Sequence, residues 1–525
     1  MADSASTPAG VTRAASMSRR DVLLVFVALM LGMLLAALDQ TIVATALPTI
    51  VGDLGGLQYL SWVITAYLLS STVSVLLYGK LSDLFGRRPL FQVAIATFLV
   101  GSLLAGAAQD MLQLVLFRAV QGVGGGGIMA TSQAMIGDLV APRERGKYQG
   151  VMGGVFALAS IAGPLLGGLF VDHLSWRWAF YINIPLGLLA MLVTARSLKL
   201  TTTPPTTRRR IDLRGALLMV GSVTSLLLVT TWGGREYAWL SPTVLGLAGA
   251  GIVLGALFVL QEQRADEPIM PLRLFGNRTF ALVSAIGFSI AMALFGAIAF
   301  MPLYLQVVQG VSATESGLRL VPMMGGMLAV SIVSGQVISR TGRYRWFPIG
   351  GSLVLTLGMV LLARLGSDSS AAMIAAAMFI VGAGVGGVMQ VTVLAAQNAV
   401  RFADLGAATA GVAFFRSMGG AFGLALYGAV LTARLDEELA ERLPAGALEQ
   451  IDPAQLTASP AVLHALPADV LGPAIEAYAS AISTVFTIAV PGAVVALLLA
   501  MLLREVPLRT TVHSDAPDDR GVADT

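Results

Sequence analysis

The chain has 525 residues, of which 56% are hydrophobic and 12% are charged, and its mean hydropathy is +0.80. Soluble domains carry about 25% charged residues, so this composition excludes an ordinary soluble protein and indicates a polytopic membrane protein. The chain has no cysteine, which excludes disulfides and thiolate chemistry. The net charge of +3 comes from basic residues in short loops between apolar segments. That pattern is typical of membrane topology and not of nucleic-acid binding.

Fourteen segments are apolar over roughly the 20 residues that a membrane-spanning helix needs. The first is longer than the apolar core of a signal peptide, about 7–15 residues, so we expect it to remain in the protein. The expected spans are residues 22–47, 59–79, 90–108, 111–137, 148–171, 178–195, 213–232, 241–261, 280–305, 315–338, 346–365, 371–398, 406–432 and 480–503.

Basic residues alternate between the loops. The loops on one side, with both termini, hold 25 of the 33 Lys and Arg residues, and the alternate loops hold six. Because short loops rich in Lys and Arg stay in the cytoplasm, we expect both termini to be cytoplasmic. An even number of spans agrees with this arrangement.

Two sequence patterns occur twice. The segment GKLSDLFGRR, at Gly79–Arg88, follows the second span, and GQVISRTGRYR begins at Gly335 in the tenth. The fourth-span segment GVGGGGIM, from Gly122, returns as GAGVGGVM from Gly382 in the twelfth. Both repeats are offset by eight spans. We therefore predict an all-α polytopic fold of two six-helix bundles with two inserted helices, which makes fourteen transmembrane helices.

A charged, Pro-rich segment marks the predicted boundary between the bundles. The expected parts are a cytoplasmic N-terminal tail at 1–21, an N-terminal bundle at 22–195, a cytoplasmic linker with the two inserted helices at 196–279, a C-terminal bundle at 280–503 and a cytoplasmic tail at 504–525. The acidic outer loop at 433–479 is expected to form a solvated helical extension of the thirteenth span.

Five motifs point to a known family: LDQTIVATALP at Leu38–Pro48, the segment Gly79–Arg88, LVLFRAVQGVG from Leu114, GPLLGG from Gly163 and SWRWAFYINIP at Ser175–Pro185. With them the chain resembles the fourteen-spanner drug:proton antiporters of the major facilitator superfamily. The resemblance implies the major facilitator fold in a bacterial cell membrane. It also implies proton-coupled export of amphipathic or cationic drugs by alternating access.

Energy from ATP and enzyme activity are not expected. The sequence has no GxxxxGK[ST] phosphate-binding loop and no cluster of intramembrane catalytic residues. The expected partners are therefore small amphipathic substrates, protons and the lipid bilayer, without nucleic acid, cofactor or metal. The three histidines lie in loops or the tail, which leaves none inside the membrane for a metal site.

Asp39 and Arg118 are candidates for proton coupling because ionisable residues inside spans are costly and usually functional. Asp39 lies about 12 Å and Arg118 about 10 Å from the outer end of their spans, at 1.5 Å per residue. Burial favours the protonated acid and a neighbouring guanidinium favours the carboxylate, so such a pair is suited to exchange a proton. The alternative is a static ion pair. The resemblance favours the coupling role, since both residues match the family's acid and arginine.

The segment Gly79–Arg88 is a candidate gate. The resemblance implies that Asp83 and Arg87 hold the two bundles together on the cytoplasmic side, and a solvated loop is the alternative. Asp138 is expected at a hydrated helix terminus. The predicted gating residues are Gly79, Asp83, Gly86, Arg87 and Arg88.

The remaining candidates concern direction and cargo. The resemblance implies that Gly163, Pro164, Gly167 and Gly168 form the bent helix contact typical of exporters, and close packing of small residues is the alternative. Arg416 is either functional or bonded to backbone carbonyls. Ser312 and Glu315 read as a helix cap. The candidates for the substrate cavity are Tyr67, Gln121, Met292, Phe295, Phe300, Tyr304, Gln390 and Arg416.

Two other functions stay open. One is transport of a single physiological solute, such as a lipid, peptide, siderophore or antibiotic. The other is a polytopic membrane enzyme or receptor, which would need catalytic residues or a soluble domain that the sequence does not contain.

Overall fold

The computed structural model describes residues 19–55, 59–140, 142–197, 212–234, 236–401, 404–443 and 467–508. The predicted tails up to residue 18 and from residue 509, the linker segment 198–211 and the middle of the acidic loop, 444–466, lie outside the described residues.

The structure is helical, and each predicted span coincides with a helix or a pair of helices. The first half contains α1 (Arg19–Leu54), α2 (Leu60–Phe85), α3 (Arg87–Gly106), α4 (Met111–Leu139), α5 (Pro142–His173), α6 (Trp178–Tyr181) and α7 (Asn183–Ser197), followed by α8 (Leu213–Trp232) and α9 (Pro242–Glu262). The second half contains η3 (Leu272–Gly276), α10 (Arg278–Val307), α11 (Ala313–Arg319), α12 (Val321–Thr341), α13 (Trp346–Leu362), α14 (Ala371–Ala399), α15 (Leu405–Arg442) and α19 (Ala468–Met501). The all-α, fourteen-helix fold is therefore confirmed.

Polar side chains define where several of these helices begin. Asp110 accepts a hydrogen bond from the Gln113 amide at the start of α4, and Ser370 accepts one from the Met373 amide at the start of α14. Asp212, Ser241 and Asn277 cap α8, α9 and α10 in the same way. Such caps satisfy amide groups that have no partner inside the helix, so each of these five helices starts directly after a polar residue.

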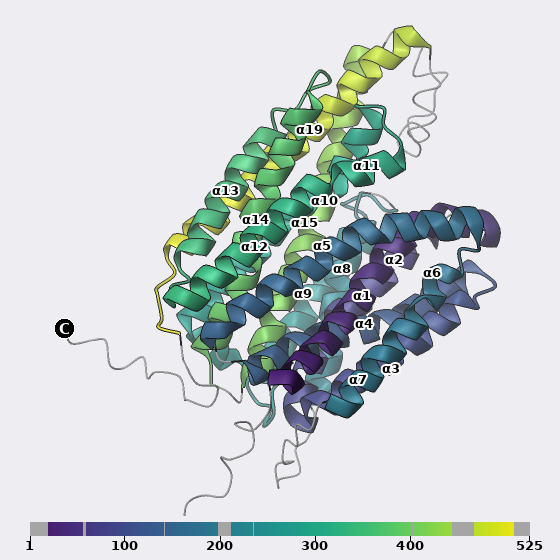
Figure 1. The fold of residues 1–525 in the computed structure, drawn as a ribbon. Helices are drawn as coiled ribbons and strands as arrows, with labels where there is room; N and C mark the ends of the chain where they lie inside the picture. The colour runs from purple at the N-terminus through teal and green to yellow at the C-terminus, as the bar shows by residue number, and fades with distance from the viewer. Residues whose placement is uncertain are drawn as a thin grey trace, which may run out of the picture.

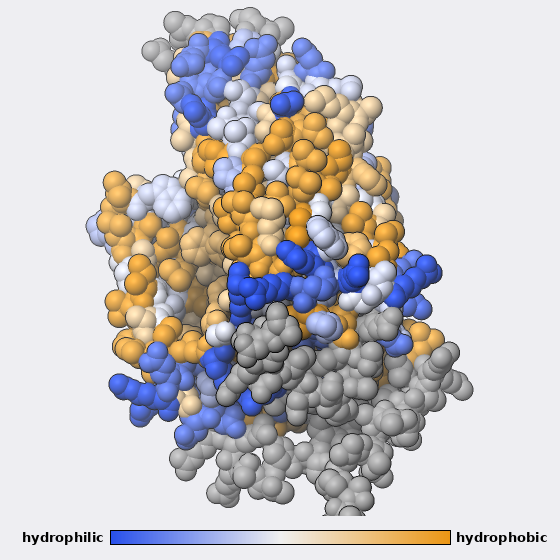
Figure 2. Space-filling model, turned by 90° about the vertical axis from the view of Figure 1, so that its left-hand side faces the viewer, coloured by the Kyte–Doolittle hydropathy of each residue, from blue (hydrophilic) through white to orange (hydrophobic). Residues whose placement is uncertain are grey.

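The helices are long and apolar enough to cross a bilayer. Thirteen described helical segments qualify by length and composition, and α13 is a shorter apolar helix of 17 residues. Figure 2 shows a broad hydrophobic belt on one face, with hydrophilic side chains above and below it. The belt is the surface expected where lipid tails surround a protein.

The helices form two groups with α8 and α9 beside them (Figure 1). Helices α1 to α7 pack together, as do α10 to α19, and α8 packs on α2 and α15. The two groups meet at the end of the molecule that carries Gly79–Arg88, which we call the hairpin end, and diverge toward the opposite end, which we call the far end (Figure 1). An edge-to-face contact between Trp62 of α2 and Trp232 of α8, with ring centroids 5.2 Å apart, joins the inserted pair to the first group.

The helices α15 and α19 are longer than their predicted spans. Helix α15 ends at Arg442 and α19 begins at Ala468, whereas the sequence predicts 432 and 480. The added turns are polar, and Arg442 forms ion pairs with Glu438 (2.6 Å) and with Glu476 of the neighbouring helix (3.1 Å). The part of α15 up to Arg442 is the helical extension of the thirteenth span that the acidic segment predicts, whereas the earlier start of α19 was not predicted.

Candidate functional site

Asp39 and Arg118 form an ion pair inside the first helix group. The Asp39 side chain is fully buried, and its Oδ2 accepts a hydrogen bond of 2.6 Å from Arg118 Nη1. The Tyr67 ring of α2 covers the guanidinium, with the Arg118 Cζ 4.2 Å from the ring centroid. The two residues that the sequence places at one depth are therefore in direct contact.

Three further polar side chains complete what we call the Asp39 cluster. Gln121 and Asn183 donate to Asp39 Oδ1 at 2.7 and 2.9 Å. Both amides also donate to Ser102 Oγ of α3, at 3.1 and 2.9 Å. Because Arg118 occupies Oδ2 and the amides occupy Oδ1, every partner described here donates to the acid. Hydrogen bonds from a guanidinium to a carboxylate are among the stronger ones in proteins.

The cluster depends on close helix approaches that single motifs do not reveal. A Cβ on Gly101 of α3 would overlap the backbone of Gln121 in α4, so glycine is needed for Ser102 to reach the cluster. Asn183 begins α7 within the motif Ser175–Pro185, and it is fully buried. Sequence reasoning included Gln121 only as a cavity candidate and missed Ser102 and Asn183.

Both copies of the repeated motif use their glycines in the same way. Gly86 has φ 92° between α2 and α3, and Gly342 has φ 73° at the end of α12. Residues other than glycine rarely adopt these angles. The first glycine of each copy lies at a contact between the two helix groups: a Cβ on Gly79 would overlap Ala410 of α15, and one on Gly335 would overlap Gly146 of α5.

Asp83 and Arg87 connect the two groups at the hairpin end. Arg87 pairs with Asp83 at 2.5 Å, and Asp83 Oδ2 accepts a 3.1 Å hydrogen bond from the Ala407 amide in the first turn of α15. A carboxylate is favourable at a helix N-terminus. Arg87 also pairs with Asp138 at 2.8 Å, and the Asp138 side chain is only 14% exposed. The expectation of a hydrated Asp138 is wrong, because Arg87 of α3 covers this end of α4.

Lys80 and Arg88 of the same segment face other parts of the hairpin end. Lys80 pairs with Glu267, which follows α9, at 2.7 Å. Arg88 donates to the Ala195 carbonyl of α7 at 2.7 Å. These contacts join the hairpin to the end of the inserted pair and to the end of the first group.

Arg145 is a second connection that sequence reasoning missed. Its side chain is buried and donates to the carbonyls of Gly137 and Val140 and, at 3.2 Å, to Gln397 Oε1 of α14. Gln397 in turn donates to the Gln133 carbonyl of α4 at 3.3 Å. An arginine in a predicted cytoplasmic loop gave no signal of this burial, which depends on the second group packing against it.

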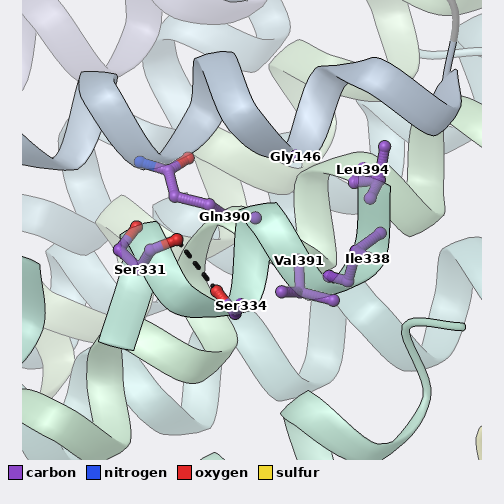
Figure 3. Close-up of a pocket in the computed structure, with 8 residues that line it drawn as sticks. Gly146, Ser331, Ser334, Ile338, Gln390, Val391 and Leu394 are labelled. Atoms are coloured by element: carbon purple, nitrogen blue, oxygen red, sulfur yellow. Dashed lines mark hydrogen bonds between the residues drawn. The ribbon is translucent and has the colours of Figure 1, made fainter. Parts of the chain in front are cut away.

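Helices α5 and α12 contact each other through small residues. Gly146 meets Gly335 backbone to backbone, and Gly150 and Gly153 face Ser331. A small cavity of about 10 Å³ lies beside this contact. Among the side chains that line it, Gln390 of α14 extends toward α5 (Figure 3). This volume accommodates a single water. The closed contact is thus tight but polar.

The GPLLGG segment packs α5 against α1. A Cβ on Gly163 would overlap Thr41, whose hydroxyl donates to the Ala159 carbonyl at 3.0 Å, and one on Gly167 would lie 3.0 Å from Thr45. Pro164 lies inside α5 and faces Gly317 of α11. A Cβ on Gly168 would meet nothing within 4 Å. Two of these glycines therefore serve close packing between α1 and α5.

The other cavity candidates occupy different environments. Phe300 and Tyr304 lie in the apolar core of the second group, where Tyr304 donates to the Gly366 carbonyl at 2.7 Å. Met292 and Phe295 of α10 pack against glycines of α15. Arg416 of α15 is partly exposed. The structure thus brings Tyr67 and Gln121 to the Asp39 cluster but leaves the remaining candidates in the second group.

Glu315 has the local role that its spacing predicts. The Ser312 hydroxyl accepts a 3.2 Å hydrogen bond from the Glu315 amide, and the Glu315 carboxylate pairs with Arg319 at 2.6 Å. Both side chains are substantially exposed.

Comparison with known proteins agrees with this architecture. The sequence profile described as Major Facilitator Superfamily matches residues 29–424. The chain belongs to the Major Facilitator Superfamily. It is 44% identical over 501 residues to an uncharacterised MFS-type transporter of Mycobacterium tuberculosis, covering 95% of this chain and 72% of that protein. It is 43% identical over 420 residues to the multidrug transporter protein MdtP of Bacillus subtilis, covering 80% and 77%.

Solved structures of the superfamily share the fold. The human organic anion transporter MFSD10 superposes with a TM-score of 0.60 at 14% identity, covering 90% of this chain and 99% of that chain. At this identity the likeness concerns the fold alone. The chain is therefore a multi-pass membrane transporter with relatives named as multidrug transporters.

Proposed function

We propose that this protein exports amphipathic organic compounds, cationic drugs among them, in exchange for protons. Two helix bundles would expose a central site alternately to each side of the membrane. The expected topology makes the hairpin end cytoplasmic. The arrangement in Figure 1, joined at that end, then corresponds to an outward-facing state.

The observation that carries the proposal is the fully buried Asp39 cluster. A carboxylate held by Arg118, Gln121 and Asn183 inside a spanning helix is costly unless all partners are present. Protonation removes the charge that holds Arg118 and weakens these charge-assisted hydrogen bonds. Proton binding is thereby able to change how α1 and α4 pack, which is what coupling to a gradient requires.

The contacts at the hairpin end are suited to control which side of the membrane the central site opens to. Asp83, Arg87 and Arg145 hold helices of the first group to α14 and α15. These contacts are polar and glycine-rich, so water replaces them when the groups separate. We propose that they bias the populations of the two states without touching cargo.

Reconstituted transport tests the proposal. Purified protein in liposomes with a defined pH gradient should move an amphipathic fluorescent dye uphill and release protons in step with it. Dye movement that ignores the pH gradient, with ATP and sodium absent, would refute proton coupling. Competition by chemically unrelated dyes separates a broad exporter from the alternative, an exporter of one physiological solute.

A further inference from the structure

Arg416 lies in the first third of α15, and its guanidinium has no partner among the described residues. The three buried arginines of the described chain, Arg87, Arg118 and Arg145, each donate to protein oxygens. Arg416 is partly exposed, and within the described residues its guanidinium forms neither an ion pair nor a hydrogen bond. A charge at this depth of a spanning helix is costly, and such residues usually face a water-filled path and bind something there.

The position of Arg416 along α15 places it just past the contact between the two groups. Ala410 of α15 meets Gly79 of α2 at the hairpin end, and Ala413 packs in an apolar cluster with residues of the first group. Arg416 is six residues beyond Ala410 toward the far end, about 9 Å at 1.5 Å per residue. It therefore lies at the base of the region where the groups diverge.

Gln390 lies on the neighbouring helix α14, at the same depth in the membrane as Arg416 and on the face of α14 that is turned toward α15. Thr409 of α15 and Gln397 of α14 are joined by a 3.1 Å hydrogen bond. Arg416 and Gln390 are each seven residues from that bond on helices running in opposite directions. Seven residues are about two turns, or roughly 10.5 Å, so both side chains leave their helices on the same face as the bonded pair.

The Gln390 amide is also incompletely used. Its Oε1 is buried without a hydrogen-bond partner, and its side chain extends toward α5 beside the small cavity (Figure 3). The Arg416 guanidinium and the Gln390 amide therefore lie at one depth without protein partners. Unsatisfied polar groups of this kind call for a ligand or water to bind them. The guanidinium of Arg416 makes this site positively charged.

We propose that Arg416 and Gln390 form a subsite that binds a carboxylate on an amphipathic cargo molecule. The planar guanidinium binds a carboxylate through two parallel hydrogen bonds. The Gln390 Nε2, which donates to no other described residue, adds a neutral donor, while its Oε1 can only accept. This inference rests on the proposed transport function and narrows its cargo. Compounds with an apolar body and one carboxylate are preferred, and permanently cationic compounds are disfavoured at this position.

Equilibrium binding to the purified full-length protein tests the subsite. The probes are a fluorescent aromatic carboxylic acid and its methyl ester, which differ only in charge at one group. Fluorescence anisotropy should show that the wild-type protein binds the acid at least about tenfold tighter than the ester, as a charge-assisted bidentate contact predicts. Arg416→Gln should remove the preference and leave ester binding unchanged. Arg416→Lys should retain part of it, because the charge remains without the planar fork.

Gln390→Glu provides an independent variant. It places a carboxylate opposite Arg416, so it should reduce acid binding as much as Arg416→Gln while leaving the ester unaffected. Arg434→Gln is the matched control, since Arg434 is exposed and pairs with Glu437 near the far end; it should keep the full preference. Retained ester binding shows that each variant is folded.

Equal affinity for acid and ester, binding of neither probe, or a preference that survives Arg416→Gln would overturn the inference. The assay contains no pH gradient. Loss of proton-driven transport with the Arg416 preference intact would therefore reject the proposed coupling and leave the subsite standing.

Discussion

At the scale of single residues, Asp39 combines full burial with donors from two other helices. Arg118 and Gln121 come from α4, Asn183 from α7, and Ser102 of α3 bridges the two amides. Removing one partner of a buried pair leaves an uncompensated charge, at a cost of about 3–5 kcal/mol. Substitution of either residue has this cost, so Asp39→Asn is compared with Asp39→Glu, which keeps the charge.

Asp39→Asn is expected to abolish uphill efflux, because an amide cannot exchange a proton, while downhill equilibration of the dye continues. Asp39→Glu should retain part of the uphill activity. Dye transport in proteoliposomes with and without a pH gradient measures both. Full gradient-driven accumulation by Asp39→Asn would show that another acid carries the proton, with Glu315 as the next to test.

Asn183→Leu is expected to destabilise the protein by about 1–3 kcal/mol, the usual range for removing a hydrogen bond to a buried charge. In the Asp39→Asn background the same substitution should cost about 0.5–1.5 kcal/mol, since the acceptor is then neutral. Unfolding of the four proteins in detergent forms a double-mutant cycle. Equal costs in both backgrounds would mean that Asn183 does not act through Asp39.

At the scale of elements, glycines determine where the two helix groups touch. Gly335 on α12 meets the backbone of Gly146 on α5, and Gly79 on α2 meets α15. The glycine repeat therefore marks two related crossings, each between a helix of the first group and one of the second. Such crossings are close only where the residues on both surfaces are small.

Gly335→Val is expected to keep the hairpin end open, because its side chain overlaps Gly146. Overpacking typically costs about 1–3 kcal/mol, which corresponds to a shift of roughly 5- to 150-fold between the two states. Transport should fall, and a cysteine introduced near the contact should label faster from the hairpin side. Gly350→Val on α13 is the control, since a Cβ there meets nothing within 4 Å. Equal transport by the two variants would contradict the closing role of the crossing.

At the scale of the whole molecule, the hydrophobic belt and the helix ends determine how the chain sits in the bilayer. The belt of Figure 2 lies between two polar ends. The bias of basic residues predicts which of them is cytoplasmic. The absence of cysteine makes that prediction simple to test.

Asp368→Cys, in the exposed turn before α14, should react with an impermeant maleimide added outside intact cells. Thr341→Cys, exposed at the C-terminal end of α12 on the hairpin side, should react only after the cells are opened. Both positions lie on the surface, so a difference between them reports the side of the membrane and not burial. The reverse labelling pattern would invert the proposed topology.

The sequence by itself determined the membrane class, the helices, the internal repeat and the superfamily. Apolar length, capping residues and glycine spacing depend only on residues close together in the sequence, so they can be identified without knowing which helices pack together. It also pointed to Asp39 and Arg118, because charge inside an apolar run stands out. Only the tertiary structure decided the partners: Asn183 and Ser102 at the acid, Arg145 between the groups, and Asp138 beside Arg87. Those contacts join helices distant in sequence, and their polar residues resemble ordinary loop and helix-end residues until the packing buries them.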